Sequence, residues 1–484
     1  MSQGSTKRLE AVPTLPIFAM LFFIALWVRL YKLQTPFFGD QSLYYYLSYT
    51  LGFGPTSVHD LAPPTAHLVV RPFMYLFFFP WARLGFTAFR LANIVVGSMV
   101  PGLVFLLSVK FRANHYLAAA VALIACLHGV LVEYSVKVFP DTLASALMLC
   151  GYLAYFSRRA RTATVLLVLM ALTKEAYALF LIPLVFDGAV RWIRHGSWLI
   201  VAPIAGFLAV FVTNGYAMFL LHAPMQGWSK NAMGEHFLPQ FLWTYWCIPF
   251  GLLLLLERRW QVLGVALAAP LFYTVWGHFL GRGVEQWYII GPLCVALVAA
   301  AVAMQSAANF FQATDIGTKP GGFKWAPVKT FLGRISATTL VAMLIMPPPE
   351  SGWRDLAKLD TLIDAVSNVP KLEPVRMWGV INVLNKLKPQ SLIVVDTFWA
   401  YSFYPFGFLT RHVGGAYSHE TNDPKEDAQL ADVLSHYDAI FWDGNVTKQA
   451  KRIRTLLKPC LIHQEAQISV YRHSQTCLAS LTKK

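Results

Sequence analysis

The chain has 484 residues, of which 56% are hydrophobic and 13% charged, and its mean hydropathy is +0.49. The charged share is about half that of a typical soluble domain, which excludes a chain that is water-soluble throughout and makes lipid the solvent for most of it. A net charge of +15 would suggest nucleic acid in a soluble protein. In a membrane protein basic residues gather at the cytoplasmic ends of spans, so membrane lipids and not nucleic acid are the expected partners.

Apolar runs bounded by charged or turn-forming residues predict an all-α polytopic membrane protein with about eleven transmembrane helices. The first run has no small-residue cleavage site after it, so it is interpreted as an anchor and not as a signal peptide. The expected spans lie near residues 14–33, 86–108, 117–136, 141–157, 162–174, 176–191, 198–221, 238–256, 261–279, 287–304 and 328–346.

Two stretches allow alternative topologies. Residues 68–84 are apolar enough for a span, but counting them as one would place Lys110 and Arg112 outside. We therefore expect an amphipathic helix there in the first outer loop, either interfacial or re-entrant. Residues 162–191 contain two short apolar runs separated by Lys174, and basic residues on both flanks favour a short hairpin with Lys174 at its outer tip over one long crossing.

The basic residues fix the orientation of this topology. Lys and Arg precede the first span and then fall at alternate ends of the spans, for example Arg158 with Arg159. Placing them in the cytoplasm gives one consistent count, with the N-terminus cytoplasmic and residue 347 onward outside. We expect an integral protein of the bacterial cytoplasmic (inner) membrane.

Residues 347–484 are predicted to form a small extracytoplasmic α/β domain, separate from the transmembrane domain of residues 1–346. The composition changes there to mixed charge with short apolar runs. Cys460 and Cys477 are the only cysteines of this domain, and an oxidising compartment would allow a disulfide between them. Strands are expected at 391–396, 438–444 and 467–472, and helices at 425–436 and 447–457.

Charged residues at the outer ends of the predicted spans come from loops far apart in sequence. Charge at membrane depth is costly and by default marks a functional site. The acids are Asp40, Asp141 and Glu175, the cations are Arg71, Lys174 and Arg282, and Tyr44 and His67 lie near them in the first outer loop.

These residues also have purely structural interpretations. Asp40 and Asp141 precede helical stretches and can cap them. Arg71 and Arg282 can extend to lipid phosphate, and the tyrosine run after Asp40 is typical of an aromatic belt. The histidines of the outer loops have no metal-ligand spacing.

Several of these stretches, in this order, resemble the integral-membrane glycosyltransferases of the GT-C fold, the group that includes protein O-mannosyltransferases and lipid A aminoarabinose transferases. The first is FFGDQSLYYYLSY, with an acid just after the first span. The second is RPFMYLFFFPWARLGFTAFRL, where Arg71 stands at the family's cation-and-proline position and Arg90 matches its later Arg-Leu. The third begins at VKVFPDTLA, with an acid before a span, and continues through a basic turn to the Leu-Thr-Lys that ends at Lys174. GRGVEQWYII is a looser match, in which Arg282 replaces the family's arginine.

The resemblance implies an enzyme that moves a sugar from a polyprenyl-phosphate donor to a hydroxyl of a lipid, glycan or protein acceptor on the outer face. Asp40 would be the general base for the attacking hydroxyl, and a single displacement would invert the anomeric carbon. Arg71, Lys174 and Arg282 would bind the donor phosphate.

The remaining site residues have less specific roles. Asp141 would orient Lys174, bind a sugar or acceptor hydroxyl, or hold a divalent metal with Asp40. The substrate-binding candidates are Tyr44, His67 and Glu175. No cofactor is required by this chemistry, and the metal is only an alternative, because Gln41 follows Asp40 where metal-dependent members often carry a second carboxylate.

Other functions fit a polytopic membrane protein. A transporter or lipid flippase would be favoured by internal repeats or by helices broken near the bilayer midplane, and no repeat stands out in the sequence. A polymerase or ligase of cell-surface polysaccharide would share the substrates. A scaffold without activity would leave the charges on one face unexplained, so the glycosyltransferase is the preferred hypothesis.

Overall fold

The computed structural model describes most of the predicted membrane domain and parts of the C-terminal domain. By contacts, the chain divides into two compact units, one of Met1–Leu33, Val69–Met74 and Arg90–Pro370, the other of Gln34–Leu68, Tyr75–Phe89 and Lys371–Lys484. The described residues are 14–30, 33, 40–51, 71–221, 254–255, 259–272, 290–315, 376–389, 392–395, 410–412, 438–443, 457–465 and 468–472.

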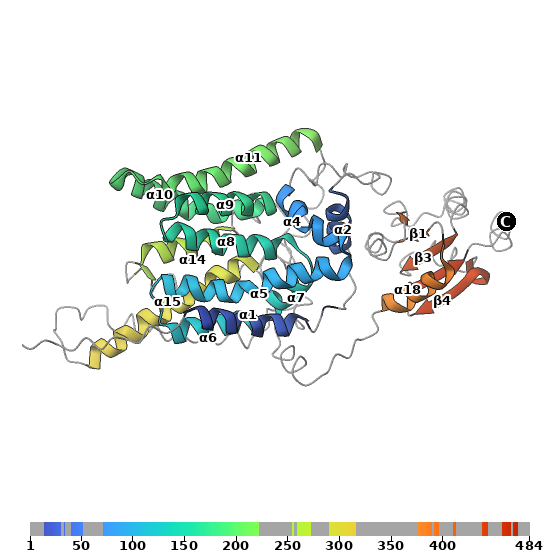
Figure 1. The fold of residues 1–484 in the computed structure, drawn as a ribbon, viewed down its shortest axis with the longest axis horizontal. Helices are drawn as coiled ribbons and strands as arrows, with labels where there is room; N and C mark the ends of the chain where they lie inside the picture. The colour runs from blue at the N-terminus through green and yellow to red at the C-terminus, as the bar shows by residue number, and fades with distance from the viewer. Residues whose placement is uncertain are drawn as a thin grey trace, which may run out of the picture. The chain divides into compact units, whose positions relative to one another are not determined.

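The first unit is a bundle of apolar helices that lie side by side (Figure 1). Helix α8 packs between α9 and α15, α9 also packs on α11, and α6 packs on α1 and α15. The helices are α1 (Thr14–Leu30), α5 (Phe86–Lys110, in this unit from Arg90), α6 (His115–Leu127), α7 (Gly129–Val136), α8 (Pro140–Phe156), α9 (Ala160–Thr173), α10 (Ile182–His195), α11 (Val201–Leu221), α14 (Trp260–Phe272) and α15 (Ile290–Asp315), with 3₁₀ turns η2 (Glu175–Leu181) and η3 (Trp198–Ile200).

These helices coincide with the described predicted spans and indicate an integral membrane protein. Among the described residues, α5 and the stretch Glu175–His195 are long and apolar enough to cross a membrane unaided, and four shorter apolar helices accompany them. The predicted span 328–346 lies outside the described residues, as does 238–256 apart from residues 254–255. The total of about eleven therefore stays a prediction.

The expected single span at 117–136 is two helices, α6 and α7, bent by 53° at His128. His128 has an extended backbone, which interrupts the i→i−4 ladder and leaves carbonyls without helical partners. The buried Arg29 supplies a donor at this break, since its Nη1 donates to the Cys126 carbonyl at 3.2 Å. Its Nη2 donates to the Leu131 carbonyl, in the first turn of α7, at 3.4 Å. A cation on α1 thus stabilises the bend.

The hairpin expected at 162–191 is present. Helix α9 ends at Thr173, and Lys174 separates it from the stretch that leads into α10. The guanidinium of Arg191, near the end of α10, lies 6.0 Å from the centre of the Tyr155 ring at the end of α8. Since α9 begins directly after α8, the end of α10 has returned to the level at which α9 starts.

Among its described residues the second unit contains two short helices from the predicted first outer loop, one further helix and a sheet. Helix α2 spans Asp40–Thr50, and the amphipathic helix expected within 68–84 is α4 (Pro72–Arg83), which belongs to this unit from Tyr75. The Tyr45 hydroxyl on α2 donates to the Ala82 carbonyl at 3.3 Å, and its ring packs edge-on against Phe89 at 5.2 Å. These contacts attach α2 to α4 and to the first turn of α5.

The sheet confirms the predicted α/β character of the C-terminal residues. Its five strands have the order β2-β1-β3-β5-β4, in which β1 is parallel to β2 and β3 while β5 is antiparallel to β3 and β4. The three predicted strands are β1 (Leu392–Val395), β3 (Ala439–Asp443) and β5 (Ile468–Arg472); strands β2 (Thr410–His412) and β4 (Leu461–Glu465) and helix α18 (Arg376–Leu387) were not predicted.

The unpredicted strands have no long apolar run, because β4 reads LIHQE and β2 only TRH. Apart from Leu457, the expected helices 425–436 and 447–457 lie outside the described residues. Cys460 is disulfide-bonded. The predicted partner, Cys477, lies outside the described residues, and the described Cys126, Cys150 and Cys294 are free.

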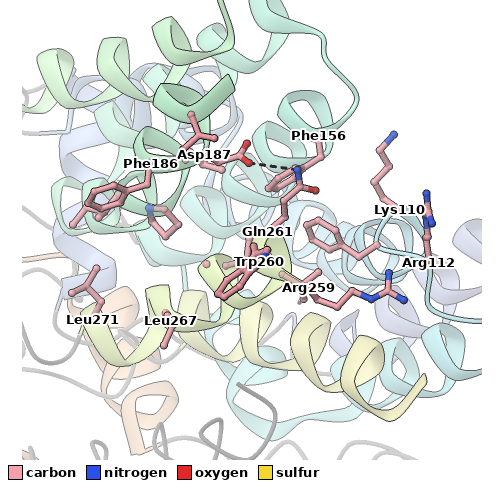
Figure 2. A pocket seen from close by; sticks show the side chains of 18 of the residues that line it. Lys110, Arg112, Phe156, Phe186, Asp187, Arg259, Trp260, Gln261, Leu267 and Leu271 are labelled. Atoms are coloured by element: carbon pink, nitrogen blue, oxygen red, sulfur yellow. Dashed lines mark hydrogen bonds between the residues drawn. The ribbon is translucent and has the colours of Figure 1, made fainter. Parts of the chain in front are cut away.

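A cavity of about 1100 Å³ opens in the first unit between α10 and α14 (Figure 2). Its walls are largely apolar, with Phe156 and Phe186 from two different helices among them. None of the predicted site residues lines it. The structure therefore separates this cavity from the charged residues that the sequence singled out.

Candidate functional site

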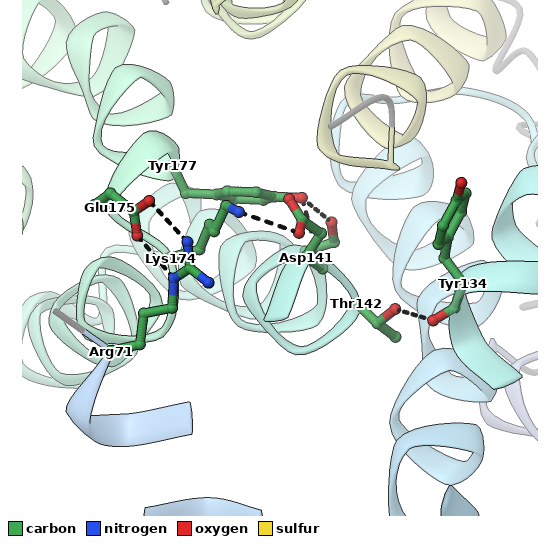
Figure 3. A network of polar contacts seen from close by, with 8 residues as sticks. Arg71, Tyr134, Asp141, Thr142, Lys174, Glu175 and Tyr177 are labelled. Carbon is green, nitrogen blue, oxygen red and sulfur yellow. Dashed lines mark hydrogen bonds and ion pairs between the residues drawn. The ribbon is translucent and has the colours of Figure 1, made fainter. Parts of the chain in front are cut away.

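Four of the predicted site residues form a charged cluster within the first unit (Figure 3). Arg71 directly precedes α4, and Glu175 begins the 3₁₀ turn η2, 104 positions further along the chain. The Arg71 Nε lies 3.1 Å from Glu175 Oε2, and its Nη2 lies 3.1 Å from Oε1. This is the two-pronged arrangement in which a guanidinium binds a carboxylate most strongly.

The second pair of the cluster is Lys174 with Asp141. Pro140 opens α8 and places Asp141 in its first turn, where an acid is favoured by the helix dipole. Lys174 Nζ lies 3.6 Å from Asp141 Oδ2, and the two side chains are 1% and 0% exposed. Within the described part of the chain the Asp141 carboxylate oxygens receive no hydrogen bond. Lys174 is therefore the group that makes burial of this carboxylate tolerable.

The backbone at Lys174 explains why neighbouring residues have different partners. Lys174 follows the end of α9 in an extended conformation, with φ −151° and ψ 113°. In extended chain successive side chains point to opposite sides. Lys174 consequently contacts Asp141, while Glu175 contacts Arg71 (Figure 3). The two neighbouring residues thus each form an ion pair with a residue from a distant part of the chain.

Tyr177 holds the backbone of Asp141 in place, and the sequence did not predict this role. Its hydroxyl donates to the Asp141 backbone carbonyl at 3.1 Å and lies 2.8 Å from Ser145 Oγ. Since the single hydroxyl proton of Tyr177 is directed at the carbonyl, Ser145 is the donor in the second contact. A Cβ on Gly291 of α15 would lie 2.9 Å from the Tyr177 ring, so the ring occupies space that only glycine leaves open. The spacing of Ser145, four residues after Asp141 on one helix face, was a usable sequence signal.

The other predicted site residues are not part of the described cluster. Asp40 is the first residue of α2, in the second unit, and its side chain lies outside what the structure describes. Tyr44 is buried on the same helix. His67 and Arg282 lie outside the described residues.

Tyr45, beside Tyr44, shows how this tyrosine run is used. Its burial, and to a smaller extent the nearby Tyr49, raise the pKa of the Tyr45 phenol. Its hydroxyl therefore stays protonated and acts as a hydrogen-bond donor to Ala82. This tyrosine has a packing role on α2 and α4.

The charges of the cluster balance, since two acids face two cations, in one buried pair and one part-buried pair. Such a network can exchange one of its internal partners for an anionic group of a ligand, because a cation already held at membrane depth requires a negative partner. Among the described residues no three His, Cys, Asp or Glu side chains come together as metal ligands. The predicted metal between Asp40 and Asp141 stays untested.

Comparison with known proteins gives a fold but no sequence family. No family model and no curated protein sequence matches the chain. The crystal structure of ArnT from Cupriavidus metallidurans in the apo state is similar to it, with a TM-score of 0.54 and 14% identity over 96% of this chain and 98% of that chain. The structure of the same ArnT bound to undecaprenyl phosphate matches with a TM-score of 0.53, the same identity and the same coverage. The expected GT-C resemblance is thereby confirmed at the level of the fold.

Proposed function

We propose that this protein is a glycosyltransferase that moves a sugar from a polyprenyl-phosphate donor to a hydroxyl of a lipid, glycan or protein acceptor at the outer face of the membrane. The observation that carries the proposal is the convergence of Arg71, Asp141, Lys174 and Glu175 in one network at one end of the apolar bundle. The fold supports it, because the similar ArnT has been crystallised with undecaprenyl phosphate.

The two cations of the cluster bind the phosphate of the donor in this proposal. A guanidinium can hold a phosphate through two parallel hydrogen bonds, and an ammonium acts as a compact point charge. The Lys174–Asp141 contact, at 3.6 Å, is looser than the bidentate Arg71–Glu175 pair, so Lys174 is the cation that exchanges its partner more readily. Arg282 is the third predicted cation.

The reaction is a single displacement at the anomeric carbon. The acceptor hydroxyl oxygen forms the new bond to that carbon as the bond from carbon to the phosphate oxygen breaks, which inverts the configuration. Asp40 accepts the hydroxyl proton as general base. The leaving polyprenyl phosphate takes the bonding electron pair, and Arg71 and Lys174 stabilise its developing negative charge.

Asp141 orients Lys174 in this proposal, because the Lys174 Nζ lies 3.6 Å from Asp141 Oδ2 and both side chains are buried. Its carboxylate oxygens, which accept no hydrogen bond from the described residues, can in addition accept one from a sugar or acceptor hydroxyl. Glu175 holds Arg71 in place, and Tyr44 and His67 are the further substrate-binding candidates. A divalent metal between Asp40 and Asp141 is the alternative role.

Sidedness follows from the distribution of charge. Arg158 and Arg159 lie in the turn between α8 and α9, and Arg161 lies in the first turn of α9. All three are exposed and lie at the opposite end of α8 from Asp141. Basic turns mark the cytoplasmic side, so the cluster faces outward and the N-terminus lies in the cytoplasm of a bacterial inner-membrane protein. The disulfide at Cys460 supports an extracytoplasmic C-terminal domain, because disulfides persist in oxidising compartments.

The broken helix at His128 is the feature that would favour a transporter, since transporters use discontinuous helices to build substrate sites. Here Arg29, from within the bundle, donates to the Cys126 carbonyl at the break and to the Leu131 carbonyl in the first turn of α7. The break is therefore stabilised by the protein itself and needs no transported ion. We prefer the transferase for this reason.

The direct test is sugar transfer by the full-length protein in membranes supplied with a labelled polyprenyl-phosphate sugar and an acceptor extract. Asp40→Asn should abolish transfer while leaving donor binding nearly unchanged, and Asp187→Asn, a carboxylate away from the cluster, should remain active. Arg71→Gln combined with Glu175→Gln removes the cation without leaving an unpaired acid, and should chiefly weaken donor use. Transport of a solute without any sugar transfer would sink the proposal.

A further inference from the structure

The cavity between α10 and α14 is an open groove with apolar walls. Three of its lining side chains are largely exposed, Phe186 by 69%, Trp260 by 61% and Leu267 by 52%, so the groove is accessible from the side of the bundle. At its floor the helices approach closely, since a Cβ on Gly264 would lie 3.3 Å from Pro183. Exposed apolar side chains of this size would face lipid in a membrane protein.

One end of the groove is strongly basic. Figure 2 shows Lys110, Arg112 and Arg259 together at one end, with the apolar Phe186 and Leu271 at the other. A fourth cation, Arg194 from the last turn of α10, also lines the groove.

None of these four cations has an ion pair with an acid in the described part of the chain. Among the described residues that line the groove the one acid is Asp187, which is already engaged by Arg191 at 2.6 Å and by Gln261 at 3.5 Å.

Part of this charge has a local explanation. Lys110 ends α5 and Arg194 lies in the last turn of α10, positions where the helix dipole favours a cation. Arg112 and Arg259 are not in such positions, because Arg112 lies beyond α5 in the left-handed region at φ 68° and Arg259 directly precedes α14. A helix N-terminus disfavours a cation, so the position of Arg259 calls for an anion nearby.

We propose that this groove binds one anionic glycerophospholipid, with its phosphate between Arg112, Arg194 and Arg259 and its acyl chains along α10 and α14. The apolar lining residues of α10 run from Ile182 to Val190, about 13 Å of helix, which suits part of an acyl chain and exceeds any free phosphate. A zwitterionic lipid would fill the apolar wall but leave the basic end without a net negative partner. Basic pockets between transmembrane helices bind anionic headgroups, and each cation is worth about fivefold in affinity.

The groove is distinct from the site proposed for the sugar donor. Helix α8 runs from Asp141 in its first turn to Phe156, which lines the groove, and its 17 residues span about 25 Å. The lipid proposal does not depend on glycosyl transfer. With the orientation proposed above, the lipid headgroup belongs to the cytoplasmic leaflet.

The test is a lipid titration of the full-length protein in detergent, followed by native mass spectrometry. Phosphatidylglycerol and phosphatidylcholine with the same acyl chains are added separately, and retained lipids are counted per protein. We expect one phosphatidylglycerol bound in preference to phosphatidylcholine. The triple variant Arg112→Gln, Arg194→Gln, Arg259→Gln should bind phosphatidylglycerol about a hundredfold more weakly, at about fivefold per cation. Unchanged phosphatidylglycerol binding by this variant overturns the proposal.

Two further variants separate the groove from general surface charge. Replacing Arg158, Arg159 and Arg161 with Gln removes the same charge from the exposed turn between α8 and α9 and the first turn of α9, outside the groove, and should leave lipid retention at the wild-type level. An equal loss in this control would assign the effect to diffuse attraction and overturn the site. Leu267→Trp keeps every cation but fills the apolar wall, and should reduce phosphatidylglycerol retention at least tenfold, an order-of-magnitude expectation for a blocked acyl-chain path. Unchanged retention would exclude the acyl chains from the groove.

Discussion

The buried pair of Asp141 and Lys174 allows the candidate site to be tested by stability as well as by activity. Both side chains are essentially inaccessible, and Asp141 accepts no hydrogen bond from the described residues. Lys174→Met would leave its carboxylate buried without the cation that faces it. Removing one partner of a buried ion pair typically costs roughly 3–5 kcal/mol.

The double variant Asp141→Leu with Lys174→Met should behave differently. It replaces both charged groups by apolar ones of similar size, a change that is often neutral or stabilising by roughly 1–4 kcal/mol. We therefore expect the double variant to be more stable than Lys174→Met alone. Both variants should lack transfer activity if the cluster is the catalytic site, so stability and activity separate in the double variant.

The measurement is the midpoint of heat-induced loss of the monodisperse chromatographic peak of detergent-solubilised protein. Lys137→Met serves as the matched control, because the Lys137–Glu133 pair is a partly exposed i,i+4 contact at 2.8 Å. Exposed pairs of this kind contribute about 0–1 kcal/mol, so its midpoint should hardly move. A Lys174→Met midpoint equal to that of Lys137→Met, or a double variant no more stable than the single one, would refute the buried-pair reasoning.

Three further changes probe the packing around the cluster. Asn93→Leu removes donors to the Ser135 carbonyl at 2.8 Å and to the Lys137 carbonyl at 3.1 Å, so we expect a loss of roughly 1–3 kcal/mol in thermal stability, and an unchanged midpoint would show these carbonyls to be otherwise satisfied. Gly291→Ala should displace the Tyr177 ring at a cost of roughly 1–3 kcal/mol, detectable as a lower midpoint than wild type. Tyr177→Phe keeps the ring but removes its hydroxyl, and should lower transfer activity with a midpoint shift of roughly 1 kcal/mol or less; wild-type activity would remove Tyr177 from the support of Asp141.

The helices of the bundle could be predicted because lipid imposes a simple rule on sequence. A run of apolar residues must be helical when its backbone has no water to bind, and charged residues bound the run. This rule predicted α5, α8 and α9 within a few residues of their observed ends. It did not predict the bend at His128, because the hydrogen-bond donors that stabilise the bend belong to Arg29. That residue is 97 and 102 positions away from Cys126 and Leu131, whose carbonyls accept these bonds.

The charged cluster was partly predictable for a related reason. The cost of placing charge at membrane depth depends on residue type, so Asp141 and Lys174 could be singled out without a structure. Which acid meets which cation depends on backbone conformation and helix positions, which the sequence does not show directly.

The extended backbone at Lys174 sends adjacent side chains to opposite sides, so Glu175 reaches Arg71 instead of its neighbour. Tyr177 could be missed for the same reason: its partners are a backbone carbonyl and a serine on another helix, and an aromatic residue in an apolar run gives no sign of either. The charged residues of a polar network in a membrane protein can thus be recognised in the sequence. The hydroxyl groups that hold those charges in position are found only from the three-dimensional arrangement of the helices.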